Sequence, residues 1–155
     1  MLYAVLLSPV LILCMALAID VGALQLQRER LASALDQSVV VASSIAALAG
    51  TGAGLDPQAA VTELQTSLVE NLTPLDTIIA GATPEEVALS ADVAVVSSVP
   101  SRDPFGGPEV ITHPTIEARI RVPVSTGLLA VTGMPSTTLL TLIAHADLSF
   151  TGPGG

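Results

Sequence analysis

The chain has 155 residues, of which 50% are hydrophobic, 2% aromatic and 12% charged, and its formal net charge is −9. Its five cations are all arginines. This balance excludes the basic surface that binds nucleic acid or adsorbs to anionic membranes, and it leaves few aromatic rings on which bases could stack.

The first 19 residues are apolar except for Ser8. At about 1.5 Å per residue, a helix of this length spans about 30 Å, the thickness of the hydrocarbon core of a bilayer. A proline is tolerated in such a helix. We therefore predict a transmembrane helix over residues 1–24, and its expected membrane-anchoring residues are Leu2, Leu6, Pro9, Leu13, Leu17 and Ile19.

A cleaved secretory signal is the competing interpretation, because Ala-Leu-Ala at residues 16–18 suits a cleavage site. No basic residue precedes the apolar run, and the helical pattern continues beyond residue 18. These two features favour a retained anchor. Cys14 follows a leucine, whereas lipid attachment requires a small residue there, so we interpret Cys14 as an apolar helix residue.

Residues 25–49 continue the helix as an amphipathic extension. No helix breaker occurs between Asp20 and Gly50, so a helix over residues 1–49 would be about 73 Å long. Its serines and alanines either allow close helix–helix contact or form core against the rest of the chain. The expected apolar stripe consists of Leu24, Leu31, Leu35, Ala42, Ile45 and Ala49.

Asp20 is the only charged residue in the first 24. One interpretation places its carboxylate at the headgroup boundary. The other pairs it with a cation of a neighbouring subunit, since Arg28 of the same helix lies about 12 Å further on. The candidate inter-subunit contacts are Asp20, Leu24, Arg28, Leu31 and Leu35.

Residues 50–155 are expected to form a small α+β head with one helix and an antiparallel sheet. Asp56 is a suitable N-cap and Pro57 a suitable first residue for the helix, which we expect Pro74 to end.

Period-two alternation predicts half-buried strands over residues 87–96, 115–122 and 137–150, with a shorter strand over 109–112. The side chains expected to face inward are Val87, Leu89, Ala91, Val93, Val95, Ile116, Ala118, Ile120, Val122, Leu140, Leu142, Ala144, Ala146, Leu148 and Phe150. Those of Ser90, Asp92, Glu117, Arg119, Arg121, Thr141, His145, Asp147 and Ser149 are expected to face outward.

Residues 98–110 are rich in proline and glycine and predict an exposed loop. The segment 125–136 is an apolar loop that either packs on the head or serves as a partner surface.

No motif predicts catalysis. His113 and His145 lie far apart in the sequence, and His145 with Asp147 suits a solvated surface pair better than a pair of metal ligands. No serine stands in the Gly-x-Ser-x-Gly elbow of a hydrolase. We expect no enzyme activity, cofactor, metal or small-molecule substrate.

Residues 4–48 resemble the N-terminal region of TadE/TadG-like pilus-assembly proteins. A weaker resemblance covers residues 116–150, where two strands flank a Val-Pro pair and an apolar loop. Members usually carry a basic leader ending in glycine and a glutamate soon afterwards, and these residues show neither. The matching elements are Pro9, the run Ile19-Asp20-Val21-Gly22, Arg28, Arg30, Leu31 and Asp36.

The resemblance implies a minor pilin or pseudopilin of the Flp/Tad type, which associates with the membrane and with other pilin-like subunits as a homo- or hetero-oligomer. It implies a head outside the cytoplasm, on the inner membrane or in a surface filament. Arg28 and Arg30, counted by the positive-inside rule, favour the opposite orientation. The alternative function is a secreted, non-catalytic binding domain behind a cleaved signal peptide.

Overall fold

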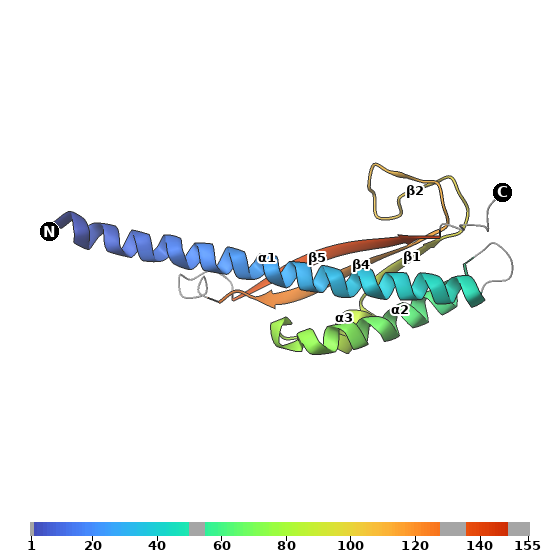
Figure 1. The fold of residues 1–155 in the computed structure, drawn as a ribbon, viewed down its shortest axis with the longest axis horizontal. Helices are drawn as coiled ribbons and strands as arrows, with labels where there is room; N and C mark the ends of the chain where they lie inside the picture. The colour runs from blue at the N-terminus through green and yellow to red at the C-terminus, as the bar shows by residue number, and fades with distance from the viewer. Residues whose placement is uncertain (1, 50–54, 128–135, 149–155) are drawn as a thin grey trace, which may run out of the picture.

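A single long helix runs through the protein (Figure 1). The computed structural model describes residues 2–49, 55–127 and 136–148, with side chains described at Ser8 and from Val10 onward in the first helix. Helix α1 covers Leu2–Ala49 without interruption and has 48 residues, which corresponds to about 72 Å. Its N-terminal part projects beyond the head, and its C-terminal part packs within it (Figure 1). The predicted continuous helix is confirmed.

The second helix, α2 (Pro57–Leu72), begins as predicted. Asp56 Oδ1 accepts hydrogen bonds from the backbone N–H groups of Gln58, at 2.9 Å, and Ala59, at 3.1 Å. A 3-10 helix, η1 (Thr73–Ile78), follows directly and contains Pro74. The proline therefore changes the helix type after Leu72, because it lacks the N–H group that would continue the α-helical pattern.

The prediction of a strand over residues 87–96 is wrong in its first half. Residues Pro84–Leu89 form a third helix, α3, and only Asp92–Val96 form a strand, β1. Thr83 Oγ1 accepts a hydrogen bond from Glu86 N, and the Glu86 carboxylate accepts one from Thr83 N, which together make a capping box. This helix buries Val87, but it leaves Leu89, which was predicted to face inward, 71% exposed. With α3, the head has more than the one helix expected.

The sheet is antiparallel, as predicted, with strand order β1-β4-β5. Strands β4 (Thr115–Ser125) and β5 (Thr137–Asp147) each have 11 residues and pair along their full length. Ile116, Ala118, Ile120 and Val122 are fully buried, which confirms the inward face of β4.

A small hairpin forms within the predicted proline- and glycine-rich loop. Strand β2 (Ser101–Arg102) pairs with β3 (Val110–Ile111). Between them, Asp103 accepts backbone hydrogen bonds from Phe105 at 2.6 Å and from Gly107 at 2.7 Å. Gly107 leaves no room for a side chain, because a Cβ atom there would overlap the Asp103 carboxylate.

The helices cover one face of the sheet. Helix α1 packs against α2, β4 and β5, while α3 contacts β4 and α2 contacts β1. Leu31, Leu35 and Val39 of α1 are fully buried in the resulting core, together with Leu64 and Leu68 of α2. The architecture is therefore α+β and pilin-like: a long N-terminal apolar helix is packed on a small head.

Candidate functional site

The projecting part of α1 has an exposed apolar surface. Its described side chains from Val10 to Val21 are almost all aliphatic, and Leu13 is 51%, Leu17 46% and Ile19 59% exposed. Within the described residues, α1 is the one helix long and apolar enough to cross a membrane, judged by length and composition. The side chains of Leu2, Leu6 and Pro9 lie outside the described residues.

The same helix has a different role inside the head. Leu31 and Leu35 are fully buried by the chain's own strands and second helix, so they present no surface to another subunit. Leu24 is half-buried and packs against this core, whereas Arg28 is exposed. Of these four residues, only Leu24 and Arg28 therefore keep the exposure that an inter-subunit contact needs.

Asp20 is only 4% exposed, although it stands in the apolar part of α1. The chain reaches Asp20 just after the C-terminal end of β4: a Cβ atom on Gly127 would lie 3.4 Å from Asp20 Oδ1. Asp20 and Thr126 each have an interaction within the chain. An 11-residue strand spans about 36 Å, so β4 returns along the helix to this buried carboxylate, while the pairing of Asp20 with a cation of a neighbouring subunit stays a prediction.

Several small residues of α1 form core within the head: Ala34, Ser38, Ala42, Ser43 and Ala46 are buried, whereas Ser33 and Ser44 are exposed. Ser38 Oγ donates to Ala34 O at 2.8 Å and accepts from Asn71 Nδ2 at 2.9 Å, so the buried hydroxyl is satisfied on both sides.

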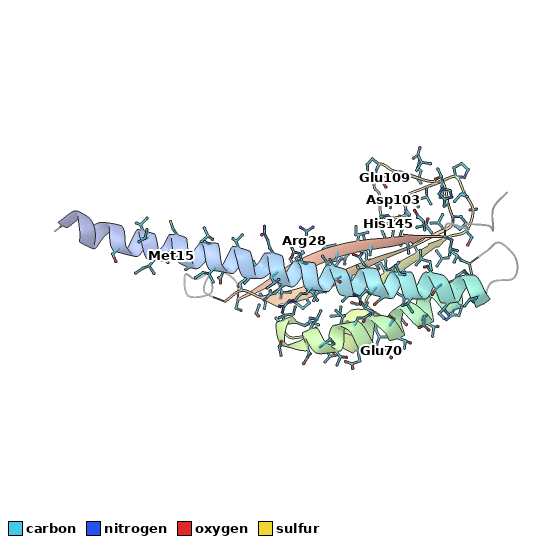
Figure 2. All side chains as sticks on the ribbon, in the orientation of Figure 1. Met15, Arg28, Glu70, Asp103, Glu109 and His145 are labelled. Carbon is cyan, nitrogen blue, oxygen red and sulfur yellow. The ribbon has the colours of Figure 1, made fainter. Side chains whose placement is uncertain are left out.

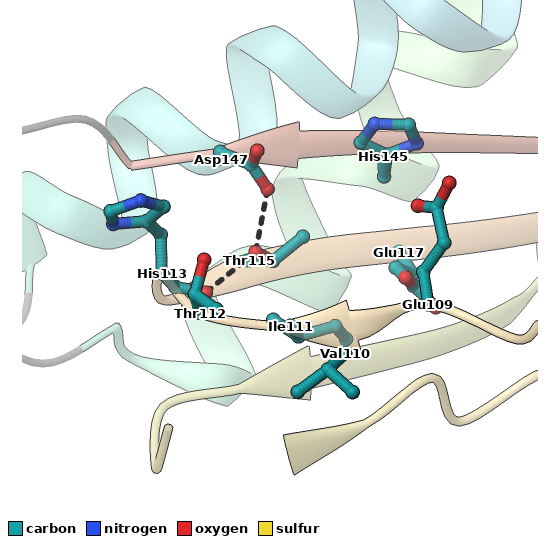
Figure 3. Close-up of a pocket in the computed structure, with 9 residues that line it drawn as sticks. All are labelled: Glu109, Val110, Ile111, Thr112, His113, Thr115, Glu117, His145 and Asp147. Atoms are coloured by element: carbon teal, nitrogen blue, oxygen red, sulfur yellow. Dashed lines mark hydrogen bonds between the residues drawn. The ribbon is translucent and has the colours of Figure 1, made fainter. Parts of the chain in front are cut away.

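A polar cavity of about 100 Å³ lies between the β2–β3 hairpin and the outer face of the sheet (Figure 3). Glu109 and His145 point into it from opposite sides (Figure 3). Thr115 Oγ1 lies 2.7 Å from Asp147 Oδ1 and 2.7 Å from His113 O, and its one hydrogen is shared between these two acceptors. His145 and Asp147 both line this cavity.

Glu117 faces outward, as predicted, and lies opposite His145 in the strand register. The hairpin covers it, however, and leaves it 8% exposed. Its Oε2 atom has no hydrogen-bond partner. Burial raises the pKa of Glu117 above its ordinary value, and the nearby Asp103 carboxylate raises it further.

The other outward residues of β4 form a surface cluster. Arg119 pairs with Asp92 at 2.7 Å, and its guanidinium lies 4.7 Å from the centre of the Phe105 ring. The Arg119 hydrogen bond lowers the pKa of Asp92. This cluster fastens the hairpin to the sheet, since Phe105 belongs to the hairpin and Arg119 to β4.

The described residues contain no group of three or more His, Cys, Asp or Glu side chains that could hold a metal ion. What the arrangement offers is packing surface: an apolar helix outside the head, and exposed valines, leucines and isoleucines on the head itself. Sequence reasoning missed the capping box at Thr83, which the Thr-Pro-Glu-Glu run signals, and the burial of Glu117, which no local pattern signals. The apolar loop residues Leu128, Leu129, Val131 and Met134 lie outside the described residues, as does Phe150.

Comparison with known proteins identifies no relative: no family model, no curated protein and no solved structure matches this chain.

Proposed function

We propose that the protein is a membrane-anchored, pilin-like subunit that assembles with other pilin-like subunits through its helix and head. One observation carries this proposal: the same unbroken helix is apolar and exposed outside the head and forms the spine of the core inside it (Figure 2). Met15 lies on the projecting part and Arg28 beside the head (Figure 2). Such a helix couples the position of the head rigidly to that of the anchor.

The head also limits the length of the anchor. Among the described residues, the contacts of the head reach Asp20, so residues 2–19 of α1 precede the head. These residues span about 27 Å, close to the thickness of the hydrocarbon core. We therefore place the membrane boundary at Asp20 rather than at residue 24.

The proposed setting is a Tad/Flp-type pilus or a related filament, in the inner membrane with an extracytoplasmic head or in the filament itself. The resemblance of residues 4–48 to TadE/TadG-like proteins supports this part of the proposal. The proposed action is association with the membrane and with other subunits, without catalysis, cofactor, small-molecule substrate or nucleic acid. The packing surfaces described above support it.

The anchor is tested by charge insertion. Arginine at the centre of a membrane helix costs about 2.5–3.5 kcal/mol per residue, so Leu13→Arg with Leu17→Arg should release the protein from carbonate-washed membranes. Leu48→Arg is the matched control, because Leu48 is 82% exposed at the other end of α1. Unaltered protein that fractionates as a soluble monomer would refute the proposal.

A secreted binding domain remains the second candidate, and one observation favours it. Among the described residues, the head's contacts reach Asp20, two residues after the Ala-Leu-Ala triplet at residues 16–18, so cleavage there would leave the core residues of the head in place. Mass spectrometry of the mature N-terminus separates the two candidates. A start at Ile19 supports the secreted domain, whereas retention of Leu13 and Leu17 supports the anchored subunit.

A further inference from the structure

The head carries two exposed apolar patches with opposite charge. The first, the acidic groove, is a hollow of about 570 Å³ between α1 and α2 in which Val40 is 58% and Val41 40% exposed. Its other lining residues are Asp36, Gln37, Glu63, Ser67, Glu70 and Asn71. Three carboxylates thus border two valines, and no basic side chain lines the groove.

The second patch, the basic sheet face, lies on the outer side of β4 and β5. Leu139 is 60% and Ile143 56% exposed, and Arg121 lies beside them on the neighbouring strand. In the strand register, Arg121 is opposite Thr141, Pro123 is opposite Leu139, and Arg119 is opposite Ile143, which puts all six side chains on one face. Arg121 is exposed beside these apolar residues, whereas Arg119 is already paired with Asp92, so Arg121 is the cation that this face offers to a partner.

These patches face in different directions. Helices α1 and α2 cover the inner face of the sheet, and the acidic groove is lined by helix residues alone, so it opens away from the sheet. The basic sheet face belongs to the side of the sheet that these helices do not cover (Figure 1). One molecule therefore cannot bring its own two patches together, whereas two molecules can.

We propose that the acidic groove of one copy receives the basic sheet face of a second copy. This inference rests on the proposed function, which places copies side by side in one membrane and in the same orientation. Apolar contact between Val40 or Val41 and Leu139 or Ile143 supplies affinity, since burial of aliphatic surface is favourable. The charges decide the orientation: a chain of net charge −9 repels its copies, except where Arg121 meets the carboxylates of the groove.

The geometry of this contact implies an open assembly. The two surfaces are different, so the contact is heterologous, and each added copy leaves one acidic groove and one basic sheet face unoccupied. A heterologous contact that does not close into a ring propagates as a helical filament. The head would then contribute directly to filament growth, in addition to the membrane helices.

Disulfide trapping in membranes tests the contact. In a Cys14→Ser background, two differently tagged full-length chains are co-expressed, one with Val40→Cys and the other with Ile143→Cys, and are then oxidised. We expect a mixed dimer from the pair and no dimer from either variant alone. A chain that carries both cysteines should give a ladder of oligomers. Leu48→Cys replaces Val40→Cys in the matched control, because Leu48 is exposed on the same helix but does not line the groove.

Charge reversal gives a second readout. Arg121→Glu in the chain with Ile143→Cys should lower the yield of the mixed dimer roughly fivefold, the effect of an exposed ion pair of about 1 kcal/mol. Glu70→Arg in the chain with Val40→Cys should restore it. Protection of β4 from trypsin shows that each variant remains folded.

The outcomes separate this inference from the function on which it rests. If chains with native Cys14 form anchor-to-anchor disulfides in membranes but Val40→Cys and Ile143→Cys give no mixed dimer, the inference is overturned and the proposed function stands. A dimer of Val40→Cys with itself would indicate a closed symmetric contact and overturn the inference. Trapping of a different protein in the groove would overturn it as well. A soluble monomer would remove both proposals.

Discussion

Replacement of Leu35 by alanine distinguishes the two roles of α1. Leu35 is fully buried in the head, so the substitution removes three carbons from the core. The lost transfer free energy is about 2.4 kcal/mol, and with the cavity left behind the unfolding free energy of the head should fall by about 3–5 kcal/mol. For a unit of about 100 residues, this corresponds to a fall in melting temperature of roughly 15 °C.

Trypsin provides the assay, because the chain contains arginine but no lysine. Two of its cleavage sites, Arg119 and Arg121, lie within β4, which pairs with strands on both sides. A brief pulse of trypsin at increasing urea concentration therefore cuts β4 only in molecules whose head is unfolded. The measurement uses full-length protein in detergent micelles, and mass spectrometry identifies cleavage within β4.

Leu17→Ala is the matched control, since it makes the same chemical change on the same helix where the side chain is 46% exposed outside the head. Its free energy of unfolding should match that of the unaltered protein within about 0.5 kcal/mol. If Leu35→Ala lowered the free energy by less than about 1 kcal/mol, or if Leu17→Ala lowered it equally, the division of α1 into anchor and core spine would be incorrect.

Three further results are expected. Thr83→Ala removes the capping hydroxyl of α3 and should lower the unfolding free energy by about 1 kcal/mol, whereas Thr83→Ser keeps the hydroxyl and should not. If both variants lowered the unfolding free energy equally in the urea–trypsin assay, the capping role would be contradicted. Burial raises the pKa of Glu117, so its charged form opposes folding, and Glu117→Gln should raise the melting temperature at pH 8. The gain should shrink as the pH falls through the range in which Glu117 becomes protonated. A gain that does not vary with pH would contradict this. Arg119 lowers the pKa of Asp92, so the stabilisation from this pair is present above the unfolded-state pKa of Asp92 and is lost as the pH falls through the folded-state pKa. NMR titration should show a midpoint for Asp92 below that of an ordinary aspartate. Arg119→Gln should return the Asp92 midpoint toward the ordinary value.

Local patterns were sufficient where neighbouring residues decide the structure. The apolar run and the absence of a breaker between Asp20 and Gly50 predicted the whole of α1, and the Asp56-Pro57 pair predicted the start of α2. The alternation in 115–122 predicted which side of β4 is buried, because successive side chains of a strand point to opposite faces. Where two local signals competed, at residues 83–89, the capping box formed a helix although the alternation predicted a strand.

Two features came only from the tertiary structure. The first is Glu117, whose period-two position predicted exposure but which is buried because a hairpin 6–16 residues earlier in the chain folds over it. The second is the use of α1. Its composition predicted an apolar stripe, but it did not show whether Leu31 and Leu35 face the head or another subunit.

The sequence by itself determined that the chain has a membrane-compatible helix joined to an amphipathic one, followed by a small antiparallel head, because these properties depend on spacing and composition. The tertiary structure decided which faces remain available to partners. Strands β4 and β5 extend back along α1 as far as Asp20 and bury this carboxylate, together with the leucines expected to contact another subunit. Strand length and packing thus leave uncovered, among other surfaces, the three on which the proposals rest: the residues before Asp20, the acidic groove and the basic sheet face.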